Sequence, residues 1–295
     1  MRVFVTGASG HLGSAVVPEL LEAGHHVTGL ARSDASAAVI KELGADVRRG
    51  DFTDLDGLRE AAAEADAVIH LAFNHDTLAA GGFADAAATD HTVVRALGDA
   101  LAGTGKALVG VGFKPTGIEA VDATINANPR SATARMLAEL ANEGVRSVLV
   151  GVPPVVHSVR DRHGFVPTLI GIARSTGVSG YLGDGSNLWP AAHALDVGRL
   201  YRLALEKAPA GAQVHAATEE GVPVREIAEA IARHLGVPAV SIPAQRAEEH
   251  FGFFATFAGM NLTMPNAGTR RLLGWDPVHP GLLADLEEGH YFTTG

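Results

Sequence analysis

Cysteine is absent from this 295-residue chain, and lysine and tyrosine are scarce. Without cysteine the protein can form no disulfide, thiolate nucleophile or cysteine metal site. The four lysines and three tyrosines leave few candidates for any reaction that needs either residue. Long apolar runs are also missing, because no stretch approaches the roughly 18 residues of a membrane-spanning helix. We therefore expect a cytoplasmic protein that has no membrane partner.

Clustered positive charge is missing as well. The formal net charge is −10 and the basic residues are dispersed, so a nucleic-acid partner is not expected. The histidines lack the spacing of a zinc-binding helix, and the G-x-S-x-G turn typical of hydrolases is not present. We therefore expect no metal and a small-molecule substrate, while the composition leaves a homodimer open.

The most informative feature that is present is a glycine-rich turn. Residues 6–13 read Thr-Gly-Ala-Ser-Gly-His-Leu-Gly and directly follow the apolar run 3–5. Gly7 permits a tight turn, Gly10 lets a pyrophosphate approach the backbone, and Gly13 lets the following helix pack on the strand. The N–H groups at the start of that helix attract the same anion. The sequence therefore predicts a dinucleotide site formed by Gly7, Ser9, Gly10, His11, Leu12 and Gly13.

Apolar strands and amphipathic helices alternate regularly from residue 2 to residue 152. This pattern predicts an α/β fold, a doubly wound parallel sheet with right-handed crossovers. Beyond residue 158, glycine and proline interrupt the pattern, which indicates a smaller C-terminal substrate-binding lobe. We expect the first domain to span 1–157 with 193–216 returning to it, and the lobe to consist of 158–192 and 217–295.

Five motifs together resemble the extended short-chain dehydrogenases/reductases of the NAD-dependent epimerase/dehydratase family, over nearly the whole chain. They are the turn at 6–13, Gly50-Asp51-Phe52, and the segments 68–72, 153–157 and 193–196. The resemblance implies a Rossmann domain with an NAD(P) cofactor. It also implies that the adenine is contacted by Asp51 and Phe52, the nicotinamide ribose by Leu71, Ala72 and Phe73, and the nicotinamide amide by Pro153 and Val155.

The end of the second strand bears on which dinucleotide binds. An NAD site usually has an acidic residue there for the ribose 2′-hydroxyl, whereas a 2′-phosphate needs a cation. Arg32 stands at about this position, with Ser33 beside it. A guanidinium can bind a phosphate through two parallel hydrogen bonds. We therefore expect NADP (NADPH) in preference to NAD; the alternative is that Arg32 is a surface residue and Asp34 a helix cap.

The sequence departs from the family at its catalytic residues. Reductases of this family use a tyrosine as acid and base, with a lysine four residues later that lowers its pKa and holds the ribose. Tyr181, Tyr201 and Tyr291 are the only tyrosines, and none has a lysine at that spacing. In the segment where the pair belongs, the tyrosine position falls within 126–131, and the lysine position falls on Arg130, Ala134 or Arg135. Arginine could replace the charge of lysine, but it cannot transfer a proton.

Three functions are compatible with this departure. The first is a reductase or dehydrogenase with a replaced acid, acting on a small apolar carbonyl or hydroxyl compound, aromatic or polycyclic. The second is a non-redox isomerase, cyclase, dehydratase or epoxide-opening enzyme, and the third is a non-catalytic NADP-binding sensor. Candidates for the catalytic group are Thr116, Ser131, His75 and Asp76. Candidates for the substrate pocket are His157, His163, Tyr181, Trp189 and Phe254, with core packing or a surface position as the alternative.

Overall fold

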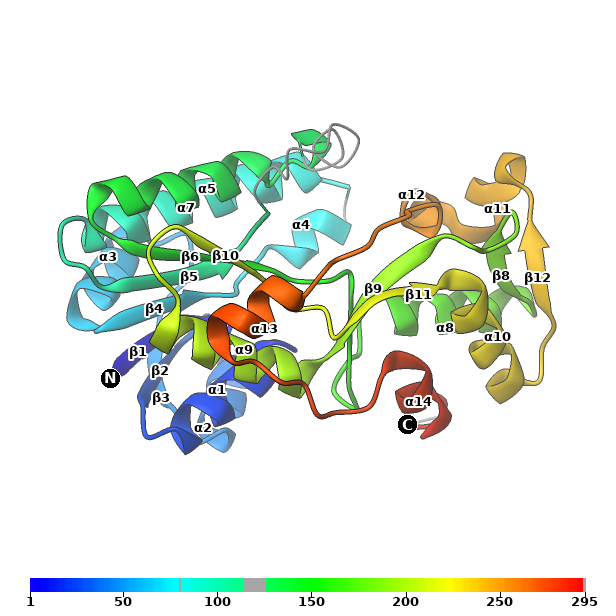
Figure 1. The fold of residues 1–295 in the computed structure, drawn as a ribbon, viewed down its shortest axis with the longest axis horizontal. Helices are drawn as coiled ribbons and strands as arrows, with labels where there is room; N and C mark the ends of the chain where they lie inside the picture. Colours follow the sequence, from blue (N-terminus) through cyan, green and yellow to red (C-terminus); the bar gives the residue numbers. More distant parts are fainter. Residues whose placement is uncertain (80, 114–125, 294–295) are drawn as a thin grey trace. The chain divides into compact units, whose positions relative to one another are not determined.

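The computed structural model describes residues 1–79, 81–113 and 126–293 (Figure 1). Backbone contacts divide the chain into two compact units, each assembled from three segments. Unit 1 consists of Met1–Gly151, Val197–Val214 and Gly268–Trp275, and unit 2 consists of Val152–Asp196, His215–Ala267 and Asp276–Gly295. The first boundary thus lies at residue 151 and not at 157, and the segment 268–275, which we expected in the lobe, belongs to unit 1.

Unit 1 is built on a seven-stranded sheet with the strand order β10-β6-β5-β4-β1-β2-β3. The pairings of β1 with β2 and β4, of β2 with β3, and of β5 with β4 and β6 are all parallel. The direction of winding reverses between β1 and β4, so the doubly wound fold expected from the sequence is confirmed. In chain order the elements are β1 (Arg2–Thr6), α1 (Gly13–Glu22), β2 (His26–Ala31), α2 (Asp34–Glu42), β3 (Asp46–Arg49), α3 (Leu55–Glu64), β4 (Ala67–His70), α4 (His75–Ala79), α5 (Phe83–Leu101), β5 (Ala107–Val111), α7 (Ser131–Glu139), η1 (Leu140–Glu143), β6 (Arg146–Gly151), α9 (Ala194–Lys207), β10 (Ala212–His215) and α13 (Ala267–Leu273).

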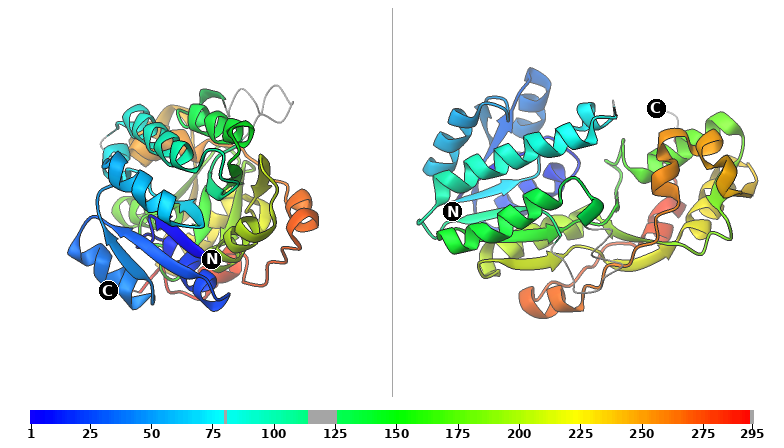
Figure 2. Two further views of the ribbon diagram at one scale, coloured as in Figure 1. Left: turned by 90° about the vertical axis from the view of Figure 1, so that its left-hand side faces the viewer. Right: turned by 90° about the horizontal axis from the view of Figure 1, so that it is seen from above.

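Helices cover both faces of this sheet. α3, α5 and α7 lie on one face, where α5 and α7 run side by side, and α1, α2 and α9 lie on the other (Figure 1, Figure 2). Val5 and Ile69 of the central strands are fully buried because both faces are covered. Leu97, Leu108 and Leu137 belong to one core between the sheet and the first of these helix layers. This core fixes the carboxyl ends of the strands, where a doubly wound fold binds its ligand.

Unit 2 contains a three-stranded sheet of order β11-β9-β7 and a two-stranded parallel sheet of β12 and β8. Its main helices are α8 and α10, of 12 residues each, and its strands have three to six residues. Glycine or proline interrupts β8, β9 and β11, whereas β7 and β12 contain neither and are only three and four residues long. The elements are β7 (Val155–His157), α8 (Phe165–Thr176), β8 (Ser179–Leu182), β9 (Leu188–His193), β11 (Glu219–Pro223), α10 (Val224–Leu235), β12 (Ala239–Ile242), η2 (Ala244–Arg246), α11 (Ala247–Phe251), η3 (Gly252–Phe254), α12 (Ala255–Ala258) and α14 (Leu282–Glu287).

The core of unit 2 is aromatic. The ring centroid of Phe165 lies 5.2 Å from that of Trp189, 4.9 Å from that of Phe254 and 5.2 Å from that of Phe257. The Trp189 indole N–H donates to the carbonyl of Met260 at 3.1 Å, which satisfies its one polar atom. Among the helices of the described residues, none is long and apolar enough to cross a bilayer.

Candidate functional site

The glycine-rich turn joins β1 to α1. Gly7 has a positive φ of 71°, and the Gly10 N–H donates to the Gly7 carbonyl at 3.0 Å. A Cβ on Gly7 would lie 2.7 Å from the amide nitrogen of Ala72, and one on Gly13 would lie 2.3 Å from the Gly7 carbonyl oxygen, so the packing of the chain excludes a side chain at both positions. A Cβ on Gly10 would meet only the Gly7 carbonyl oxygen, at 3.3 Å, and Gly10 is exposed. Gly10 is therefore the glycine of this turn that faces open space, where a ligand could approach the backbone.

The first turn of α1 offers no competitor for an anion. Leu12 occupies the N-cap position, no side chain caps the helix there, and its first turn contains no acidic residue. The positive end of the helix dipole therefore has no carboxylate of its own to balance it. Ser9 and His11 lie in the same turn, and the Ser14 hydroxyl donates to the His11 carbonyl at 2.7 Å. This arrangement suits the pyrophosphate of a dinucleotide.

Arg32 directly follows β2, but it already has an acidic partner. Its Nη2 lies 3.0 Å from Asp76 Oδ2, and both side chains are largely exposed (58% and 79%). Asp76, a catalytic candidate from the sequence, is thus the counter-ion of Arg32. The Ser33 hydroxyl accepts a hydrogen bond from the Ser36 N–H and caps α2, so part of its hydrogen-bonding capacity is used within the chain.

Asp51 and Phe52 follow β3. Asp51 Oδ1 accepts hydrogen bonds from the backbone N–H of Thr53 at 2.8 Å and from its hydroxyl at 2.7 Å. These two hydrogen bonds lower the pKa of Asp51, and the positive charge of Arg32 adds to the effect. The carboxylate is therefore ionised and held at the end of its strand, while Phe52 is partly buried against the core of unit 1.

Leu71, Ala72 and Phe73 follow β4 and are tied to the glycine turn. The Leu71 N–H donates to the Thr6 carbonyl at 3.1 Å, and the Ala72 N–H donates to the Thr6 hydroxyl at 3.3 Å. The two hydrogen bonds lie beside the close approach of Gly7 to Ala72. The structure therefore joins the turn that the sequence pattern assigned to the pyrophosphate and the segment that the family resemblance assigned to the nicotinamide ribose.

A buried polar chain, which the sequence did not reveal, lies beneath these segments. The Thr6 hydroxyl is 2.7 Å from His70 Nδ1, and His70 Nε2 is 3.1 Å from Asp90 Oδ1. All three side chains are buried. Burial alone would raise the pKa of the Asp90 carboxyl, but the hydrogen bond from His70 and the charge of Arg130 outweigh it and hold the pKa below its usual value. In the sequence, the only signal of this network was the polar residue His70 within the otherwise apolar run 67–72.

Arg130 completes the polar chain. Its Nε lies 3.2 Å from Asp90 Oδ2, and its guanidinium carbon lies 4.4 Å from the centroid of the Phe73 ring. Its side chain is 23% exposed. Arg135, another of the positions at which we considered a replacement for lysine, is exposed and donates to the Asn126 side chain at 3.3 Å. The structure therefore brings only the first of these two arginines to the segment after β4.

The remaining catalytic candidates are dispersed. His75 begins α4, is exposed, and lies with its ring edge to face against Phe73 at 5.6 Å. Ser131 begins α7, and its hydroxyl lies 3.5 Å from the Asn126 carbonyl oxygen. Thr116 lies outside the described residues. The catalytic roles of these residues stay predictions.

The three tyrosines differ in environment. Tyr201, which is the only tyrosine of unit 1, is fully buried, and burial raises its pKa. In unit 2, Tyr291 donates its hydroxyl hydrogen to Asp161 Oδ2 at 3.2 Å, and the Arg225 guanidinium lies 5.7 Å above the Tyr181 ring. A fully buried phenol has no access to a substrate, so Tyr201 is unsuited to the role of the missing acid.

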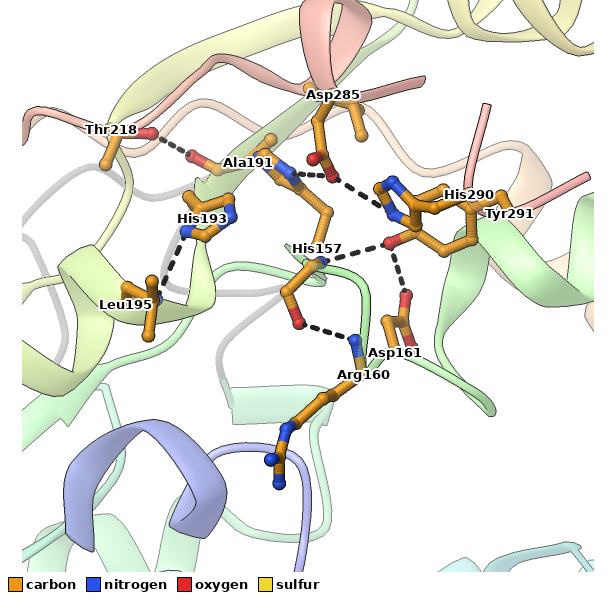
Figure 3. A network of polar contacts seen from close by, with 12 residues as sticks. His157, Arg160, Asp161, Ala191, His193, Leu195, Thr218, Asp285, His290 and Tyr291 are labelled. Atoms are coloured by element: carbon orange, nitrogen blue, oxygen red, sulfur yellow. Dashed lines mark hydrogen bonds and ion pairs between the residues drawn. The ribbon is translucent and has the colours of Figure 1, made fainter. Parts of the chain in front are cut away.

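Unit 2 contains a polar cluster of its own around His157 (Figure 3). His157 is fully buried, and its Nδ1 lies 2.8 Å from Asp285 Oδ2. The His193 ring meets that of His157 edge to face at 5.4 Å and stacks on that of His279 at 4.7 Å. Burial, together with the neighbouring imidazoles, lowers the pKa of His193 to about 4, so this ring is neutral at pH 7. Asp285, Glu288 and His290 each place one potential ligand atom within 4.8 Å of the others.

The other residues assigned to the substrate or the nicotinamide take varied positions in unit 2. Trp189 and Phe254 are buried in the aromatic core, which fits the packing alternative, and His163 is exposed. Pro153 and Val155 are both buried, and Val155 pairs with Ala191 of β9. Contact of any of these residues with a ligand stays a prediction.

Comparison with known proteins agrees with this geometry. Residues 7–164 match the family described as NAD(P)H-binding. An uncharacterized protein of Schizosaccharomyces pombe is 40% identical over 304 residues, which cover 99% of this chain and all of that protein. An uncharacterized protein of Saccharomyces cerevisiae is 39% identical over 299 residues, which cover 98% and 99%.

Solved structures share the fold at lower identity. The UDP-glucuronic acid 4-epimerase of Bacillus cereus, in complex with UDP-glucuronic acid and NAD, superposes with a TM-score of 0.72 at 19% identity and covers 99% of this chain and 98% of its own. The dTDP-glucose 4,6-dehydratase of Bacillus anthracis, in complex with NAD, gives a TM-score of 0.72 at 14% identity and covers 98% and 95%. The chain thus belongs to the NAD(P)H-binding family, and its fold is that of the extended short-chain dehydrogenases/reductases of the epimerase/dehydratase type.

Proposed function

We propose that this protein is an NADP-binding enzyme that oxidises or reduces a small, rather apolar carbonyl or hydroxyl compound with an atypical active site. The observation that carries the cofactor half of this proposal is the open position of Gly10 at the uncapped start of α1. Its backbone can approach a pyrophosphate, whose charge the helix dipole stabilises.

Arg32 supports NADP in preference to NAD. It is a cation directly after β2, and no acidic residue takes its place in the sequence. A 2′-phosphate carries more negative charge than the Asp76 carboxylate and can displace it from the guanidinium. Because the pair of Arg32 and Asp76 is exposed, breaking it costs only about 1 kcal/mol or less.

Partial similarity to a named reductase supports the redox part of the proposal. Cinnamoyl-CoA reductase 1 of Oryza sativa is 47% identical over 77 residues, which cover 24% of this chain and 23% of that enzyme. A non-redox reaction is the second candidate, and the absence of a tyrosine followed four residues later by lysine favours it. Consumption of NADPH in proportion to product supports the first function. Turnover without a change in absorbance at 340 nm supports the second.

Calorimetric titration of Gly10→Ala with NADPH and NADH tests the cofactor proposal. Within the chain the added methyl group meets only the Gly7 carbonyl oxygen, at 3.3 Å, which must yield slightly. The same methyl group intrudes on the pyrophosphate, so we expect at least a tenfold loss of affinity with only a small change in melting temperature. Gly268→Ala is the matched control, since Gly268 lies in α13 of the same unit with nothing within 4 Å of its would-be Cβ. Failure of the wild-type protein to bind either dinucleotide, or equal binding by Gly10→Ala, would contradict the proposal. Tighter binding of NADH than of NADPH would contradict the preference for NADP.

A further inference from the structure

Arg130 is held in place from two sides, and among the described residues one of its guanidinium nitrogens has no partner. Nε and Nη2 face the Asp90 carboxylate at 3.2 and 3.4 Å, and the plane lies over the Phe73 ring. Among the described residues, no hydrogen bond or ion pair engages Nη1. The side chain is 23% exposed, whereas that of Asp90 is 2% exposed. Such an arrangement fixes the direction of the remaining N–H donors before any ligand arrives.

A chain of hydrogen bonds connects Arg130 with the strand that precedes the glycine-rich turn. Asp90 is hydrogen-bonded to His70 at the end of β4, and His70 is hydrogen-bonded to Thr6 at the end of β1. β1 and β4 are the two strands between which the winding of the sheet reverses, and a doubly wound fold binds its dinucleotide at that point. Arg130 and the pyrophosphate turn are therefore connected through three buried side chains.

The order of strands tells which half of the cofactor Arg130 faces. With the pyrophosphate at the turn after β1, the adenine half extends toward the ends of β2 and β3, so the other half extends toward β4 and β5. Phe73 follows β4, and Arg130 lies on its ring. Arg130 therefore belongs to the nicotinamide side, well separated in the sheet from Arg32 after β2.

We propose that Arg130 donates hydrogen bonds from Nη1 to the ribose hydroxyls on the nicotinamide side of the bound cofactor, as a fixed cation where the family has a lysine. This inference rests on the proposed binding of a dinucleotide. Arg130 holds and orients the cofactor, and it transfers no proton because a guanidinium stays protonated. Asp90 and His70 are positioning residues that keep Arg130 in this direction.

The test compares a whole dinucleotide with its adenine half. Arg130→Met is titrated calorimetrically with NADPH and with 2′-phospho-ADP, which has the adenine, the 2′-phosphate and both bridging phosphates but not the second ribose. We expect affinity for NADPH to fall roughly tenfold or more, because a hydrogen bond to a charged group is lost. Affinity for 2′-phospho-ADP should stay within twofold. If the wild-type protein binds NADH more tightly, NADH and ADP serve as the pair.

Arg135→Met is the matched control, because Arg135 lies on α7 and is exposed; it should bind both ligands as the wild type does. Arg130→Gln keeps a hydrogen-bond donor beside Asp90, so it covers the case in which Arg130→Met does not fold, and it too should lose affinity for NADPH alone. Arg130→Lys should lose less affinity than either variant, because lysine carries the same charge. Equal weakening of both ligands, or no weakening of either, would overturn the role of Arg130 while the dinucleotide site itself stands. A wild-type protein that binds neither NADPH nor NADH would overturn the proposed function instead.

Discussion

The stability of the protein should depend on pH through His193 of unit 2. This ring is half-buried between His157 and His279, and its Nδ1 accepts a hydrogen bond from the Leu195 N–H at 3.3 Å. Burial comes first among the causes that lower its pKa to about 4, and the charges that the neighbouring imidazoles can carry come next. In the unfolded chain the same ring titrates near its usual value of 6.5.

The sign and the size of the effect follow from these two values. Between pH 6.5 and about 4 the unfolded chain binds a proton that the folded protein does not. The contribution of neutral His193 to the free energy of unfolding is therefore fully present above pH 6.5, and it is lost as the pH falls through about 4. The difference between the values corresponds to roughly 3 kcal/mol, and because the ring is only half-buried, screening by solvent reduces it to roughly 1–2 kcal/mol.

Urea unfolding at pH 7.0, 6.0, 5.0 and 4.5, followed by tryptophan fluorescence in a Trp275→Phe background, tests this value. Trp189 is then the only tryptophan, and it reports on the core of unit 2. Between pH 7.0 and 4.5 the free energy of unfolding of His193→Asn should fall by roughly 1–2 kcal/mol less than that of the parent protein. His163→Asn is the control because His163 is exposed, and it should follow the parent. Parallel curves for His193→Asn and the parent would refute the reasoning.

Three further predictions concern unit 1 and the aromatic core. Asp76→Asn removes the carboxylate partner of Arg32 and should tighten binding of NADPH, but not of NADH, by about threefold in a fluorescence titration; unchanged binding of NADPH would show that the pair does not compete with the phosphate. Gly98→Ala should lower the free energy of unfolding by about 1–3 kcal/mol in urea, because its Cβ would lie 2.6 Å from both methyl carbons of Leu140; a neutral effect would mean that α5 shifts freely. Trp189→Ala should cost about 3–5 kcal/mol by the same assay, since the indole is fully buried, and a loss below about 1 kcal/mol would argue against its role in the core.

The fold of unit 1 was predictable because its signals are local. Each strand is an apolar run between turn residues, and the glycines at 7, 10 and 13 have spacing that only a strand-turn-helix junction requires. The strands of unit 2 were not predictable, because Leu188–His193 and Glu219–Pro223 are short, contain proline and pair with segments far along the chain. Their pairing depends on contacts that no window of sequence contains.

In the candidate site, too, the local feature was predictable from the sequence and the long-range contacts were not. The turn itself follows from its residues, whereas the contact of His70 with Asp90 joins positions 20 residues apart and that of Asp90 with Arg130 joins positions 40 apart. Sequence patterns place charged residues on the surface by default, so a carboxylate inside α5 is expected to be exposed. Only the fold shows that Asp90 is buried with two partners.

A tyrosine and lysine pair performs two tasks, proton transfer and the supply of a fixed positive charge, and under our proposal two different groups perform them in this chain. Arg130 can supply the charge, because Asp90 and Phe73 hold its guanidinium in place. Tyr201 cannot supply the proton, because it is fully buried and burial raises its pKa further. Any proton that the reaction needs must therefore come from another side chain, from water or from the substrate. The glycine-rich turn thus predicts the cofactor of this protein more firmly than it predicts the chemistry.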